Sequence, residues 1–179
     1  KDYYLYDWLP QAKDWTMCAS IDGTGPIGEF IRTGLKWDEW DRNFREGVVL
    51  PGGHDKMIMD LTITGPGMFD LKNFLDYALE LDVKIETKRM FAFHPDIVLS
   101  PMAWPRHILD EIVNDVLDYA RPIVTDKQQT LIRELEGMLT APTFQEEFPD
   151  TAEDQFFNGR GYQQIIHTIR KDGENGRLT

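Results

Sequence analysis

The chain has 179 residues, of which 41% are hydrophobic and 28% are charged, and its formal net charge is −12. A chain of this length buries roughly 70% of its unfolded surface, which predicts one compact domain or a large piece of one. The negative charge repels a phosphate backbone and an anionic membrane, so neither nucleic acid nor membrane is an expected partner. Because Cys18 is the single cysteine and no signal peptide or apolar run of about 20 residues occurs, we expect a cytoplasmic protein without disulfides.

Strand and helix patterns alternate over the first half of the chain. The segments 14–20, 56–64 and 83–93 are short, rich in apolar residues and partly alternating, which predicts three strands. Between them, the segments 36–48 and 69–81 repeat apolar residues every three or four positions, which predicts two helices. Strands separated by helices at this spacing are typical of parallel βαβ units, so the predicted fold class is α/β.

The pattern changes after the third predicted strand. HPDIVLSPMAWP contains three prolines, which predicts an extended connection. Helices are expected over 106–120 and 126–139, and from Thr151 to Ile169 with an interruption or kink near Gly159 and Gly161. We therefore divide the chain into an α/β part, 1–120, and a helical extension, 121–179.

A glycine-rich stretch follows the first predicted strand. Gly23-Thr-Gly25-Pro-Ile-Gly28 has the G-x-G-x-x-G spacing of a dinucleotide-binding turn. Such a turn requires a long helix that begins at the third glycine, but Gly34 interrupts six residues later and Pro26 stiffens the turn. The sequence therefore disfavours a dinucleotide site, and a glycine-rich connection without a ligand stays open.

The same region resembles a known enzyme family. Ser20-Ile-Asp22-Gly23, Glu29-Phe-Ile-Arg32-Thr-Gly34 and a helix with Trp37 and Asn43 occur in the order seen in radical S-adenosylmethionine (SAM) enzymes, in the branch with SPASM/twitch-type relatives. The segments LKNFLDYALEL and IVLSPMAWPRHILDEIV extend the resemblance, which covers Trp15 to about Ala120. It implies the C-terminal half of a partial (β/α)6 barrel, with SAM across the carboxyl ends of the strands.

The resemblance also implies roles for four residues. Ser20 and Arg32 are expected to bind the carboxylate of SAM, since a hydroxyl and a guanidinium both donate to it. Asp22 is expected either to accept from the ribose or to cap its own turn. Thr62 lies near the end of the strand expected on the adenine and ribose side, where ordinary β-branched packing explains it equally well.

The cysteines that would hold the family's [4Fe-4S] cluster are missing. No C-x-x-x-C-x-x-C motif occurs, and Cys18 alone cannot supply three thiolates. Together with a first residue, Lys1, that is not methionine, this suggests the C-terminal half of a longer enzyme. The intact enzyme would take an electron from a donor, cleave SAM reductively and use the 5′-deoxyadenosyl radical to abstract hydrogen from an unknown small-molecule or peptide substrate.

Two other functions remain open. A binding or scaffold module could keep the half-barrel without a cluster, and an unrelated α/β enzyme could use Asp22, Asp60 or Glu86 as an acid or base. For Asp60 and Glu86 we favour a helix-facing position or an exposed one at a strand end over one facing the barrel interior. No metal site is expected, because the four histidines, at positions 54, 94, 107 and 167, show no metal-binding spacing.

Overall fold

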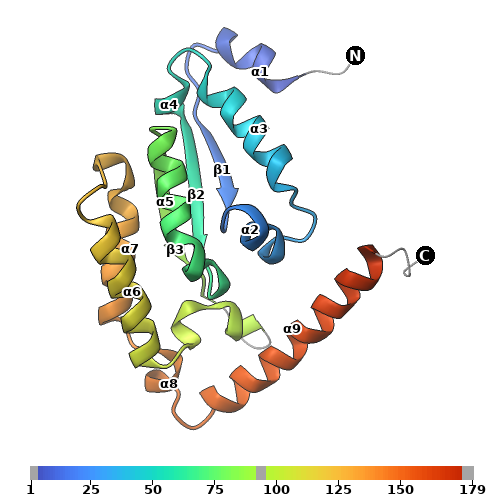
Figure 1. Ribbon diagram of the computed structural model, residues 1–179, viewed down its shortest axis with the longest axis vertical. Coiled ribbons are helices and arrows are strands. Elements are labelled where there is room, and N and C mark those ends of the chain that lie inside the picture. The colour runs from blue at the N-terminus through green and yellow to red at the C-terminus, as the bar shows by residue number, and fades with distance from the viewer. Residues whose placement is uncertain (1–3, 92–95, 175–179) are drawn as a thin grey trace.

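The computed structural model describes residues 4–91 and 96–174 (Figure 1). It contains a three-stranded parallel sheet whose strands are neighbours in chain order: β1 (Met17–Ile21), β2 (Met57–Ile63) and β3 (Lys84–Arg89). β2 and β3 lie within the segments expected from the sequence, and β1 extends one residue beyond its segment, to Ile21, so the predicted parallel α/β arrangement is confirmed.

The remaining elements are helical. In chain order they are α1 (Leu5–Trp8), η1 (Leu9–Gln11), α2 (Gly25–Ile31), α3 (Trp37–Val48), α4 (Gly53–Lys56), η2 (Pro66–Asp70), α5 (Leu71–Glu80), η3 (Asp96–Leu99), η4 (Pro101–Ala103), α6 (Arg106–Ala120), η5 (Asp126–Gln128), α7 (Gln129–Thr140), α8 (Phe144–Glu147) and α9 (Ala152–Glu174). The η elements are short 3₁₀ helices.

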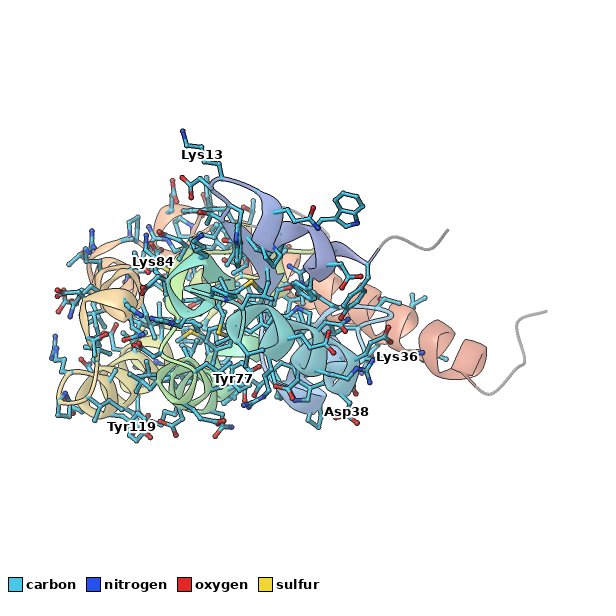
Figure 2. The ribbon with its side chains drawn as sticks, turned by 90° about the horizontal axis from the view of Figure 1, so that it is seen from above. Lys13, Lys36, Asp38, Tyr77, Lys84 and Tyr119 are labelled. Atoms are coloured by element: carbon cyan, nitrogen blue, oxygen red, sulfur yellow. The ribbon has the colours of Figure 1, made fainter. Side chains whose placement is uncertain are left out.

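One face of the sheet packs on helices. Parallel strands in sequential order are joined by right-handed crossovers, which place the connecting helices α3 and α5 on the same face. Alternate residues of β2 are buried there, and Met59, Leu61 and Ile63 join Phe44 of α3 and Phe74 of α5 in one core. Seen from above, Tyr77 of α5 and Tyr119 of α6 both lie on this helical side of the molecule (Figure 2). The hydrophobic core therefore lies between the sheet and its helices.

The outer edge of β3 is closed by the segment that follows α6. Gln128 of η5 donates from Nε2 to the carbonyl oxygen of Val83 at 2.8 Å, and Thr130 of α7 donates from its hydroxyl to the carbonyl oxygen of Ile85 at 2.5 Å. Covering an edge strand in this way satisfies its outward backbone groups and ends the sheet. The helical segment beyond residue 120 therefore packs directly on the sheet.

Two expectations for the later part of the chain were wrong. The helix from Ala152 runs without interruption through Gly159 and Gly161, because isolated glycines only cost a helix about 1 kcal/mol each. The proline-rich segment contains the 3₁₀ helices η3 and η4 instead of extended chain alone. Ser100 begins η4 by accepting the Met102 N–H, and Pro101 suits the first position of a helix.

Candidate functional site

The second face of the sheet is polar. Because side chains alternate along a strand, the residues between the buried ones point away from the core helices. Three of them, Ser20, Asp60 and Glu86, are register partners across β1, β2 and β3. Thr62 and Lys88 are partners in the next row toward the carboxyl ends of the strands. We call this surface the open face. In parallel α/β sheets, ligands usually bind just beyond the carboxyl ends of the strands, next to its last row.

A hydrogen-bonded network on the open face joins all three strands. Ser20 donates its hydroxyl proton to Asp60 Oδ2 at 3.0 Å, and Lys88 Nζ donates to both carboxylate oxygens of Asp60 at 2.8 Å. The ammonium of Lys88 holds the pKa of Asp60 below its ordinary value, helped by the Ser20 hydroxyl and the charge of Arg32, although partial burial acts in the opposite direction. Asp60 is therefore an anion at neutral pH and a weak proton acceptor.

Asp22 and Arg32 form a two-point ion pair beyond the end of β1. Arg32 donates from Nε to Asp22 Oδ2 at 2.5 Å and from Nη2 to Asp22 Oδ1 at 3.2 Å. The Asp22 side chain is 10% exposed, whereas that of Arg32 is 39% exposed. The pair thus has a buried carboxylate that orients a guanidinium accessible from solvent.

The glycine-rich loop is held by a buried carboxylate of the same chain. The backbone N–H and hydroxyl of Thr24 both donate to Asp70 Oδ2, the hydroxyl at 2.8 Å, and Asn73 donates to Asp70 Oδ1 at 3.0 Å. A Cβ on Gly28 would lie 2.2 Å from the carbonyl oxygen of Gly23, so close packing requires glycine there. The spacing that resembled a dinucleotide turn therefore serves the packing of α2, a seven-residue helix that the sequence analysis did not predict.

Two parts of the Glu29–Gly34 element also have structural roles. Glu29 accepts the N–H of Trp37 at 2.8 Å, at the beginning of α3. Gly34 has a positive φ of 84°, which favours glycine. The element links α2 to α3 while Arg32 extends toward Asp22.

The structure brings the four predicted site residues to one end of the sheet. Ser20 and Thr62 are on the open face, and Asp22 and Arg32 are paired next to it. Asp60 and Glu86, in the same face, lie within their strands and not on the helix-facing side. The structure thus excludes the helix-facing alternative for both residues, whose partners Lys88 and Lys84 lie on the open face as well, and the Glu86 side chain is 43% exposed.

The sequence analysis missed Lys88 and Asp70 as parts of this region. The signal for Lys88 was the alternation of charges at positions 84, 86 and 88, which places all three side chains on one strand face. Asp70 gave no such signal, because its partner Thr24 is 46 residues away in the chain.

The described residues, 4–91 and 96–174, show neither a metal-binding cluster nor a membrane-spanning helix. No group of three or more His, Cys, Asp or Glu side chains there has an arrangement that could hold a metal ion. His94 and the side chain of His167 lie outside the described part of the structure. Within the same ranges, no helix combines the length and apolar character needed to cross a bilayer.

No family model matches this chain, and neither a curated protein nor a solved structure is significantly similar to it.

Proposed function

We propose that this chain is the C-terminal half of the partial (β/α)6 barrel of a radical SAM enzyme, with its open face lining the barrel interior. The observation that carries the proposal is the division of the sheet into a helix-covered apolar face and a polar face that ends in Ser20, Asp22 and Arg32. This division is compatible with a partial barrel, in which the helices would lie outside and the ligand groups at the carboxyl ends of the strands.

The two edges of the sheet support the same proposal. The outer edge of β3 is closed by Gln128 and Thr130, which suits the last strand of an open barrel. β1 forms the other edge of the sheet, and β2 is its strand partner in the described part of the chain. A preceding parallel strand would pair at this edge.

The residues present fit part of SAM. Arg32 offers N–H donors to a carboxylate, and Asp22 keeps the guanidinium oriented. Thr62 has a hydroxyl on the open face for the ribose or adenine. Two roles were expected for Asp22: to accept from the ribose or to cap its own turn. Both of its carboxylate oxygens accept from Arg32, which disfavours the ribose contact.

The residues present do not fit an iron–sulfur cluster. Cys18 is the single thiol of the sequence and is exposed, so the cluster ligands of such an enzyme would have to come from outside these 179 residues. When bound, SAM and the cluster would supply the 5′-deoxyadenosyl radical that abstracts hydrogen from the substrate. The contribution of this chain would be to bind SAM.

The test is Arg32→Ala in the natural full-length protein. Removing a charged hydrogen-bond donor costs about 1.5–3 kcal/mol, so SAM should bind about 10- to 100-fold more weakly by calorimetry. The visible absorbance of the cluster should be unchanged. Arg45→Ala is a matched control, since Arg45 is also 39% exposed and ion-paired, but its partners Asp41 and Glu80 lie on the helices. Equal SAM affinity in wild type and Arg32→Ala would contradict the proposal.

A second candidate is a binding or scaffold module without redox chemistry. It is favoured by one observation: Arg32 and Lys88 are already paired with Asp22 and Asp60, so the open face is stable without a ligand. The two functions differ in turnover. A scaffold would leave SAM intact in the presence of a reductant, whereas the enzyme would release methionine.

A further inference from the structure

Helix α9 changes character near its middle. Its first half includes the buried residues Ala152 and Gly159, and the helix contacts α8 and η3. From Arg160 onward, every residue of α9 whose exposure the structure describes is exposed. Figure 1 and Figure 2 both show α9 extending away from the sheet and its helices. Because most helices in proteins are stabilised by packing of one face, the second half of α9 presents a face that is available to a partner.

Two large apolar side chains of α9 are exposed along one side of the helix. Phe157 and Ile165 are each 59% exposed. Gly161 lies four residues from each of them, and residues four apart share a helix face. A glycine inside a helix costs about 1 kcal/mol relative to alanine. Among the described residues, nothing lies within 4 Å of a Cβ placed on Gly161, so packing within that part of the chain does not explain this glycine.

A cavity of about 440 Å³ lies beside Phe157, where the beginning of α9 meets α8 and the segment after η4. Its lining is mainly apolar, from Pro105, Pro149, Phe156 and Phe157, with polar groups from Gln145 and Glu153. A cavity of this size is large enough for an apolar side chain of a docked helix.

The two sides of this region carry opposite charges. Residues 144–154, which include Glu153 of the cavity, contain five acidic residues and no basic one. Residues 155–171 contain three basic residues and no acidic one. Because the whole chain has a net charge of −12, two copies repel each other in most orientations. An antiparallel pair of α9 helices instead places the basic part of each copy beside the acidic part of the other.

We propose that the partner of this surface is a second copy of the chain, joined through an antiparallel pair of α9 helices centred on Gly161. Since Phe157 and Ile165 are equally far from Gly161, this pairing places Ile165 of each copy at the cavity beside the partner's Phe157. The interface is isologous, so this contact occurs twice. The glycines meet at the centre, where the absence of a side chain lets the helices approach closely. The inference is independent of the proposed function.

Sedimentation equilibrium of the natural full-length protein, over about 1–100 μM, measures this association directly. We expect the wild type to reach the mass of two chains at the upper end. Ile165→Asp should weaken the dimer about 100-fold or more, because it places an unpaired carboxylate in both apolar contacts. Val49→Asp is the matched control, since Val49 is 81% exposed but follows α3, and it should change the affinity less than about twofold. A monomeric wild type, or equal affinities in the two variants, would overturn the inference.

Gly161→Ala separates an effect on the interface from an effect on folding. Alanine is the better helix former, so the helical signal in circular dichroism should stay the same or increase. The added methyl group should nevertheless weaken the dimer about 10-fold, because it keeps the two helices apart. Unchanged association of this variant would overturn the pairing centred on Gly161.

A mixture of two variants tests the antiparallel orientation. Phe157→Lys and Ile165→Asp should each be monomeric alone. In the mixed dimer, the introduced lysine of one copy lies beside the introduced aspartate of the other, and the second contact keeps the natural Phe157 and Ile165. Association should therefore recover in the mixture. Parallel helices would bring like positions together, so the absence of recovery would overturn the inference.

Discussion

The two faces of the sheet are made by the same three strands and differ in almost every physical property. On the covered face, Met59, Leu61 and Ile85 are at most 1% exposed and pack against helices. On the open face, Asp60 of β2 and Lys88 of β3 are charged and hydrogen-bonded to each other. One face is built for burial and the other for polar contacts, so neighbouring residues of one strand should respond very differently to substitution.

The largest difference is expected between Leu61→Ala and Thr62→Ala. Leu61 is 1% exposed on the covered face, and deleting its side chain leaves a cavity that should lower the free energy of unfolding by about 2–5 kcal/mol. Thr62 is its neighbour on the open face, and Thr62→Ala should lower the free energy of unfolding by less than about 1 kcal/mol. Urea unfolding followed by circular dichroism measures both. Similar losses for the two variants would show that the open face is also packed.

A smaller effect is expected when Lys88→Met removes the cation beside Asp60. The pKa of Asp60 should then rise from its lowered value, which an NMR titration of the side-chain carboxyl carbon detects. Because the folded pKa is lowered, Asp60 adds stability above the ordinary value of about 3.9, and this is lost as pH falls through the folded pKa. The stability difference between wild type and Lys88→Met should therefore disappear in acid. An unchanged Asp60 pKa would contradict the network.

The smallest effect is expected for Lys84→Met. Lys84 pairs with Glu86, but both side chains are more than 40% exposed, and exposed ion pairs contribute about 0–1 kcal/mol. The free energy of unfolding should change by less than about 1 kcal/mol in urea, and the pKa of Asp60 should stay at its lowered value. A larger loss would mean that Lys84 supports the sheet in a way that its pairing with Glu86 does not explain.

The elements could be predicted where local patterns were strong. The helix 106–120 was predicted with the bounds of α6, because Pro105 precedes it and its apolar residues recur on one stripe. By contrast, α2 was missed because Gly25, Pro26 and Gly28 are poor helix formers. Tertiary contacts hold this helix, through Asp70 on Thr24 and the close approach of Gly28 to Gly23.

The candidate site was predicted as a set of residues, without their partners. Ser20 and Thr62 were placed near strand ends by local pattern, and the family resemblance drew attention to Asp22 and Arg32. Neither argument predicted that Asp22 forms an ion pair with Arg32 or that Asp60 accepts a hydrogen bond from the Ser20 hydroxyl. That second contact commits the hydroxyl proton of Ser20 to a partner within the chain.

The sequence by itself determined the alternation of strands and helices and which residues share a strand face, because side-chain periods of 2.0 and 3.6 are local properties of the backbone. The tertiary structure decided which face the helices cover and which charges meet. Ser20 and Asp60 are 40 residues apart, and Asp60 and Lys88 are 28 residues apart. Such contacts depend on strand order and register, which arise only when the whole sheet packs on its helices.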